Sequence, residues 1–107
     1  MSPEGLRPIL TELRRGLGRI YGDRLIELVL YGSQARGDAE PGSDIDVLVV
    51  LKGPVAWGQE ISRTSNFVAE LCLKHSVVIS RLFMDENEFL HEQGPLLRNI
   101  GREGVPV

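Results

Sequence analysis

The fold is decided by the stretch GSQARGDAEPGSDIDVLVV, which occupies residues 32–50. The apolar run from Leu25 to Tyr31, broken only by Glu27, precedes it and predicts a buried strand that stops at Gly32. The residues from Ile45 to Leu51 predict a second buried strand. Turn-forming residues 37–43 separate the two runs. Two strands with a polar, glycine-rich connection between them are therefore expected in a small sheet.

The flanking sequence predicts helices on either side of these strands and one further strand. Helical spacing of apolar residues predicts an amphipathic helix over residues 3–21, capped by Ser2. Pro8 leaves a second alternative open, in which the regular part of the helix begins only at that residue. A second long helix is predicted from Trp57 to Lys74, and a third strand from Val77 to Met84. Asp85 is expected to cap a short helix ending at His91, with a last helical turn over residues 96–100. The order is helix, strand, strand, helix, strand, helix, which predicts a single α/β domain over residues 1–107.

Composition limits the classes of protein that fit. The chain has 107 residues, 42% of them hydrophobic, and a net charge of −3, which disfavours duplex nucleic acid as the main partner. The longest apolar run, Val47 to Leu51, is too short to cross a membrane, and nothing at the start resembles a signal peptide. Cys72 is the single cysteine, so no internal disulfide is expected. We expect a cytoplasmic protein, with self-association left open.

The turn after the first strand has features of a phosphate-binding site. A strand that ends in Gly32-Ser33 and enters a short helix presents free backbone N–H groups and a favourable helix dipole. Gly32 lets the backbone approach an anion, and the Ser33 hydroxyl adds a donor. On these two residues alone, an ordinary turn with a capping serine is the better interpretation.

Asp44 and Asp46 change that balance. Residues two apart on a strand share a face, about 6.5–7 Å apart along it, so both carboxylates point the same way. Such a pair repels itself unless a cation sits between its members, and Mg²⁺ readily takes one or two carboxylates together with substrate phosphates. An acidic strand edge that discourages pairing is the alternative. Beside a phosphate-binding turn, the metal interpretation is favoured.

The spacing of these residues resembles the signature of a known superfamily. Gly32-Ser33, ten intervening residues and Asp44-Ile45-Asp46 are similar to the motif of the polymerase-β-like nucleotidyltransferases. The wider segment resembles the minimal nucleotidyltransferases, antitoxin partners of HEPN-domain toxins. The resemblance implies a mixed β-sheet flanked by α-helices, ATP or another nucleoside triphosphate bound with Mg²⁺, and transfer of AMP to an acceptor hydroxyl, in some relatives on a tyrosine of the partner toxin. It implies Asp44 and Asp46 as catalytic metal ligands and Gly32 and Ser33 as phosphate-binding residues.

The sequence departs from the family pattern at one position. Family enzymes generally carry a third carboxylate on a later strand, which completes a two-metal site. Here that strand contains no acid, and the match to the family places the lost carboxylate at Val78, with Ser80 on the same face after a two-residue slip. A nucleotide-binding antitoxin that acts by contact, with weak or no catalysis, is therefore the second hypothesis. A nucleic-acid-binding adaptor is the third.

Other candidates carry less weight. Arg36 is expected either to brace the acid pair or reach the triphosphate, or to form a structural ion pair. Asp38 is interpreted as a turn residue, and Trp57 as a packing anchor rather than a platform for a base. Structural or solvated roles are expected for two histidines and four helical arginines: His75, His91, Arg7, Arg14, Arg15 and Arg19.

Overall fold

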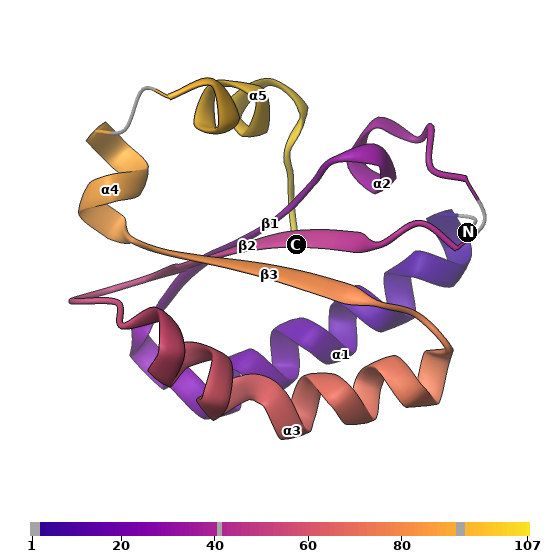
Figure 1. The fold of residues 1–107 in the computed structure, drawn as a ribbon, viewed down its shortest axis with the longest axis horizontal. Coiled ribbons are helices and arrows are strands. Elements are labelled where there is room, and N and C mark those ends of the chain that lie inside the picture. Colours follow the sequence, from indigo (N-terminus) through magenta and orange to yellow (C-terminus); the bar gives the residue numbers. More distant parts are fainter. Residues whose placement is uncertain (1–2, 41, 92–93) are drawn as a thin grey trace.

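The computed structural model describes residues 3–40, 42–91 and 94–107. One four-stranded sheet, in the order β3-β2-β1-β4, lies between two layers of helices (Figure 1). The elements in chain order are α1 (Pro3–Tyr21), the short 3-10 helix η1 (Gly22–Arg24), β1 (Leu25–Tyr31), α2 (Ser33–Arg36), β2 (Ile45–Leu51), α3 (Trp57–His75), β3 (Ile79–Asp85), α4 (Glu86–His91), α5 (Pro95–Glu103) and β4 (Val105–Pro106). In the described part of the chain, no helix is both long and apolar enough to span a bilayer.

The sheet is mixed, because its strands are joined by two kinds of connection. β1 and β2 run antiparallel, whereas β2 and β3, joined through α3, run parallel. The short β4 pairs antiparallel with the far edge of β1, through Val29 and Leu30. This α+β architecture confirms the predicted mixed sheet flanked by helices.

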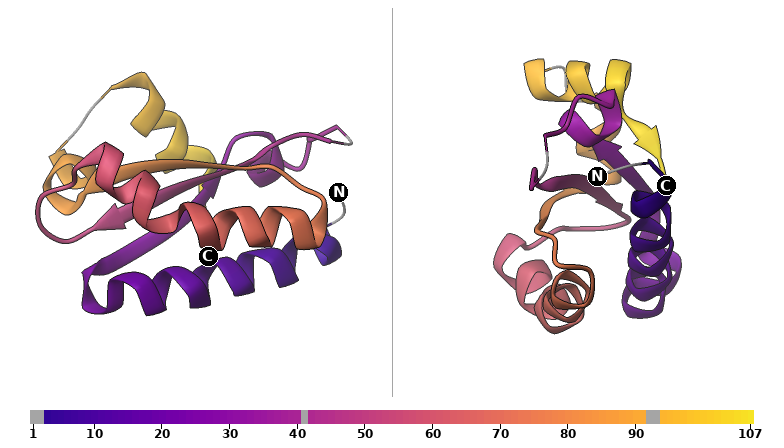
Figure 2. Two further views of the ribbon diagram at one scale, coloured as in Figure 1. Left: turned by 60° about the horizontal axis from the view of Figure 1, so that its bottom comes forward. Right: turned by 90° about the vertical axis from the view of Figure 1, so that its right-hand side faces the viewer.

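The two faces of the sheet are covered differently. α1 and α3 pack side by side on one face (Figure 2) and bury the larger core, which includes Leu13, Leu28, Val47 and Phe83. On the other face, Ile100 of α5 packs with a smaller buried group from β1 and β2: Val29, Leu48 and Val50. Asp46 lies on this second face, because successive side chains of a strand alternate between its faces. It is near the start of β2, directly after the connection from α2.

Most predicted boundaries are confirmed, and the exceptions have local causes. β1 and β2 have the predicted bounds, and α1 begins at Pro3 with Pro8 inside it; the proposed Ser2 cap lies outside the described residues. The predicted start of the third strand at Val77 is wrong. Ser76 adopts a left-handed conformation (φ 54°) that ends α3, and the Val77 N–H donates to the Cys72 carbonyl, so β3 begins only at Ile79. The two-residue β4 was missed because so short a strand has no periodicity.

Candidate functional site

The site begins at the tight turn after β1. Gly32 has φ 75° and ψ −156°, a conformation that favours glycine, and its carbonyl accepts hydrogen bonds of 3.1 Å from the N–H groups of Ala35 and Arg36. These bonds close α2 into one helical turn directly after the strand. The N–H groups at the start of such a turn, from Ser33 and Gln34, have no acceptor within the helix. The structure therefore has the predicted tight turn from strand to short helix, and phosphate binding at this turn stays a prediction.

Gly32 also lies against one of the two carboxylates. A Cβ atom added to Gly32 would stand only 2.6 Å from Asp46 Oδ2. Asp46 reaches this place because it is paired with Tyr31, the residue before Gly32, across the β1–β2 ladder. The fold thus brings the turn and the acid together, although they are distant in sequence, and only a glycine leaves room for the carboxylate.

The electrostatics of the acid pair favour a bound cation. Partial burial, and secondly the negative charge of Asp44, raise the pKa of Asp46. Burial and then the charge of Asp46 likewise raise the pKa of the Tyr31 hydroxyl. Among residues 3–40, 42–91 and 94–107, no lysine, arginine or histidine forms an ion pair with Asp44 or Asp46. Two oxygen-ligand side chains without a protein counter-charge fit a hard divalent cation such as Mg²⁺.

Arg36 does not supply the missing positive charge. Its guanidinium forms two ion pairs of 3.1 Å, from Nε to Asp38 Oδ2 and from Nη1 to Glu103 Oε2. These hydrogen bonds, that to Asp38 first, raise the pKa of Arg36. Of the alternatives left open by the sequence, the structure realises the structural ion pair, and it links α2 to the end of α5. Asp38 accordingly contributes to the turn as its partner.

The parallel register identifies the residue that faces Asp46 from β3. Asp46 is paired with Ser80, and the Ile45 N–H donates to the Val78 carbonyl at 2.9 Å. Ser80 is exposed, whereas Ile79 is buried on the opposite face. Within the described segments, no group of three or more histidine, cysteine, aspartate or glutamate side chains is arranged to hold a metal ion. Asp46 therefore lies beside a serine of β3, and neither Val78 nor Ser80, the two positions predicted for the third carboxylate, is an acid.

Two other candidates have structural roles. Trp57 packs edge-on against Phe83 of β3, with ring centroids 6.1 Å apart, which supports its interpretation as a packing anchor. His75 contacts Glu12 of α1, together with Lys74. Glu103 is a neighbour of the site that the sequence did not reveal, because 67 residues separate it from Arg36 and no local pattern marks it.

Comparison with known proteins shows that the chain belongs to a family of nucleotidyltransferases. A family model described as "Nucleotidyltransferase domain" matches residues 10–101, and the chain belongs to this family. It is 35% identical over 96 residues to a "Putative protein adenylyltransferase" of Methanocaldococcus jannaschii, an alignment that covers 89% of this chain and 90% of that protein.

Solved structures share the fold. A putative nucleotidyltransferase from Sulfolobus solfataricus superposes with a TM-score of 0.63 at 23% identity, covering 96% of this chain and 82% of that one. A structure described as a toxin-antitoxin with AMP-PNP superposes with the same TM-score of 0.63 at 16% identity, covering 90% of this chain and 69% of that one.

Proposed function

We propose that the chain binds a nucleoside triphosphate, ATP in the first instance, together with Mg²⁺, and transfers AMP to a hydroxyl group of a partner protein. The observation that carries the proposal is the close approach of the Asp46 carboxylate to Gly32, where an added Cβ would stand 2.6 Å from Oδ2. It joins a turn suited to phosphate with an acid pair suited to Mg²⁺, the two halves that nucleotide binding requires. The adenylyltransferase names of the relatives support AMP as the transferred group.

Each residue has a defined part in the reaction. Ser33 and the N–H groups that follow Gly32 hold phosphate oxygens, and Asp44 and Asp46 hold Mg²⁺, which when bound neutralises charge on the phosphates. The acceptor oxygen forms a bond to the α-phosphorus, and the bond from that phosphorus to the bridging oxygen breaks. Pyrophosphate leaves with the electron pair of the broken bond, and the hydroxyl proton passes to solvent.

The proposed partner is a toxin protein with a HEPN domain. Similarity to toxin-antitoxin structures, one of them described with AMP-PNP, supports a partner of this kind and nucleotide binding. The second candidate is an antitoxin that neutralises its partner by contact and uses the nucleotide only as a structural ligand. The pairing of Asp46 with Ser80, rather than with an acid, favours this candidate.

A matched pair of glycine variants tests the nucleotide site. Gly32 and Gly37 both have positive φ, at 75° and 81°, but only a Cβ at Gly32 meets the Asp46 carboxylate. Both Gly32→Ala and Gly37→Ala therefore carry backbone strain, while only Gly32→Ala and the larger Gly32→Val displace the acid. By calorimetry with Mg·ATP, we expect binding to fall at least tenfold in the Gly32 variants and little in Gly37→Ala.

The acid pair provides the second arm of this test. Asp44→Asn and Asp46→Asn should lose the Mg²⁺ dependence of ATP binding, and Ser33→Ala should weaken binding less because one donor of several is removed. Unchanged affinity in Gly32→Val would place the phosphates elsewhere. Equal affinity in wild type and both asparagine variants would overturn the metal assignment.

A further inference from the structure

β3 has one edge that no strand covers. In the sheet order β3-β2-β1-β4 it is the outermost strand on its side, and in the described part of the chain β2 is its one partner (Figure 1). The Val78 carbonyl accepts a hydrogen bond of 2.9 Å from the Ile45 N–H of β2, so every second residue from Val78 onward directs its backbone groups toward β2. Arg81 and Phe83 alternate with these residues. Their N–H and carbonyl groups therefore point away from β2, toward the free edge.

The Arg81 side chain lacks an opposite charge. It is partly buried on the face of the sheet that α3 covers, the face on which Phe83 belongs to the core. Its guanidinium donates to the hydroxyl of Thr64, a buried residue of α3. Among the described residues, no carboxylate forms an ion pair with Arg81. Burial lowers the pKa of Arg81, as expected for a cation removed from water without a counter-charge.

The free edge and this arginine together define a binding surface. An inward-pointing charge on an edge strand discourages indiscriminate pairing. It also makes pairing selective, because a strand that places a carboxylate beside the charge supplies its missing partner. Opposite side chains of an antiparallel pair have Cβ atoms about 4.5–5.5 Å apart, within reach of an arginine–carboxylate pair. We infer that the β3 edge binds an extended segment of another protein, which adds a strand and places an aspartate or glutamate beside Arg81.

The flank of α3 next to this edge specifies the neighbours of that acid. α3 lies on the β3 side of the helical layer, and α1 lies on the β1 side (Figure 2). Phe67, Glu70 and Lys74 line the groove between α3 and α1. By helical spacing, Ile61 and Cys72 lie on the other flank of α3, and both are partly buried against the core. The added strand should therefore carry apolar side chains on either side of its acid.

A second copy of this chain fits the requirement poorly. β3 contains one acid, Asp85, and its Oδ1 already accepts a hydrogen bond of 2.7 Å from the Glu88 N–H at the start of α4. At the opposite edge of the sheet, the two-residue β4 contains no acid and ends in Pro106. The occupant is therefore a segment of a partner protein. This inference goes beyond the proposed function, because it requires neither nucleotide nor metal.

Amide hydrogen exchange on the full chain tests the edge directly. The probe is a capped peptide of alternating threonine and valine with glutamate in place of the central valine; the control peptide has glutamine there. The glutamate peptide should slow exchange of the Arg81 and Phe83 amides at least about tenfold and leave those of Ser80 and Leu82, which face β2, unchanged. Equal protection by both peptides, or none, would overturn the inference. Protection that depends on protein concentration without peptide would overturn it in favour of a second copy.

Arginine variants test the source of the selectivity. In calorimetry, Arg81→Gln should remove at least about fivefold of the preference for the glutamate peptide, whereas Arg81→Lys, which keeps the charge, should retain most of it. Arg19→Gln, the same change at an exposed position of α1, is the matched control and should keep the full preference. A preference that persists in Arg81→Gln would overturn the inference. Mg·ATP binding should be normal in Arg81→Gln, so a failure of the proposed nucleotide site is measured separately.

Discussion

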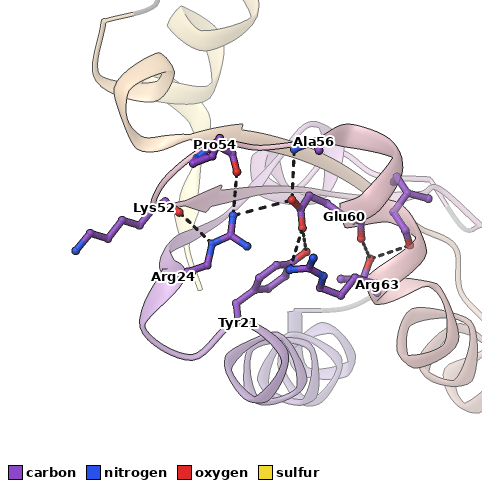
Figure 3. A network of polar contacts seen from close by, with 9 residues as sticks. Tyr21, Arg24, Lys52, Pro54, Ala56, Glu60 and Arg63 are labelled. Atoms are coloured by element: carbon purple, nitrogen blue, oxygen red, sulfur yellow. Dashed lines mark hydrogen bonds and ion pairs between the residues drawn. The ribbon is translucent and has the colours of Figure 1, made fainter.

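Two acidic sites at opposite ends of the sheet differ in whether the protein itself supplies partners for the carboxylate. Glu60, at the start of α3, is almost fully buried, yet it is surrounded by donors from three segments of the chain (Figure 3). Asp46, at the start of β2, is less buried, and its nearest charged influence is a second carboxylate, Asp44. The protein itself supplies hydrogen-bond donors and positive charges to Glu60, and it supplies no ion-pair partner to Asp46 among the described residues.

The contacts of Glu60 form a closed network. Its Oε1 accepts a hydrogen bond of 3.0 Å from the Tyr21 hydroxyl, and its Oε2 accepts one of 3.4 Å from the Ala56 N–H. Arg24 and Arg63 form ion pairs with it at 4.0 and 3.8 Å, and both guanidinium groups lie over the Tyr21 ring. Burial, and then the hydrogen bond to Glu60, raise the pKa of Tyr21 and keep its hydroxyl protonated as the donor. The network fastens α1 to the loop before α3.

The difference is the one expected between a structural acid, Glu60, and the ligand-binding acid that we propose at Asp46. A buried carboxylate that contributes to folding needs its counter-charges in the native chain, because an unpaired buried charge is costly. A carboxylate that binds a cation lacks counter-charges from the protein. Its repulsion from the neighbouring carboxylate therefore persists until the cation is bound. Loss of Glu60 should therefore impair folding, and loss of Asp46 should impair binding.

The largest expected effect is that of Glu60→Ala on stability. Removing the carboxylate leaves Tyr21, Arg24 and Arg63 without their common partner, and breaking such a network costs about 3 kcal/mol of the free energy of unfolding. Urea unfolding followed by circular dichroism measures this loss. The control, Glu70→Ala at an exposed position of α3, should stay within about 0.5 kcal/mol of wild type. If Glu60→Ala were as stable as the control, Glu60 would not be a structural acid.

The next effect concerns catalysis at the unsatisfied site. A third carboxylate should hold a metal on the acceptor side and activate the hydroxyl, so Val78→Asp or Ser80→Asp should raise AMP transfer about tenfold or more, with ATP affinity little changed. The register between Asp46 and Ser80 favours the Ser80 variant. Transfer of radiolabel from ATP to the partner protein is the measurement.

Ile79→Asp and Val77→Asp are the matched controls for this experiment. They lie on the other face, where Ile79 belongs to the buried core and Val77 packs against it, so an acid there should only destabilise the fold. Rapid transfer by wild type, without improvement in either rescue variant, would show that two carboxylates suffice.

A smaller effect is expected in the pH dependence of stability. Because the pKa of Asp46 is raised in the folded state above its ordinary value of 3.8, the folded chain releases this proton less readily than the unfolded chain. Without Mg²⁺, this group's stabilising contribution is therefore present at pH below 3.8 and is lost as the pH rises through the folded pKa. Asp46→Asn lacks this loss, so its stability relative to wild type should increase over that window in thermal melts. Adding Mg²⁺ at pH 7 should stabilise wild type and leave Asp46→Asn unchanged.

The sequence predicted the central part of the fold and site because both depend on local patterns. The bounds of β1 and β2 follow from two apolar runs. Strand alternation also predicted a shared face for Asp44 and Asp46, but β2 begins only at Ile45, so Asp44 precedes the strand and its shared face stays a prediction. The contact between Gly32 and Asp46 and the pairing of Asp46 with Ser80 depend on register, which no local pattern specifies. Tyr21 and Arg24, which contact Glu60, and Glu103, which contacts Arg36, come from distant segments and could not be predicted for the same reason.

The smallest expected effect decides what Arg36 does. Its side chain is 42% exposed and that of Glu103 is 37% exposed, so their ion pair contributes less than about 1 kcal/mol. If the pair only braces α2, Arg36→Gln and Glu103→Gln should each weaken Mg·ATP binding by the same small factor, about two- to threefold, and the double variant should be no worse than either. If Arg36 instead leaves Glu103 to bind the triphosphate, Arg36→Gln should lose tenfold or more, and Glu103→Gln should bind as well as wild type or better. A double-mutant cycle by calorimetry distinguishes the two roles. We expect the first pattern, because the two ion pairs of the Arg36 guanidinium are made with Asp38 and Glu103 rather than with the acid pair.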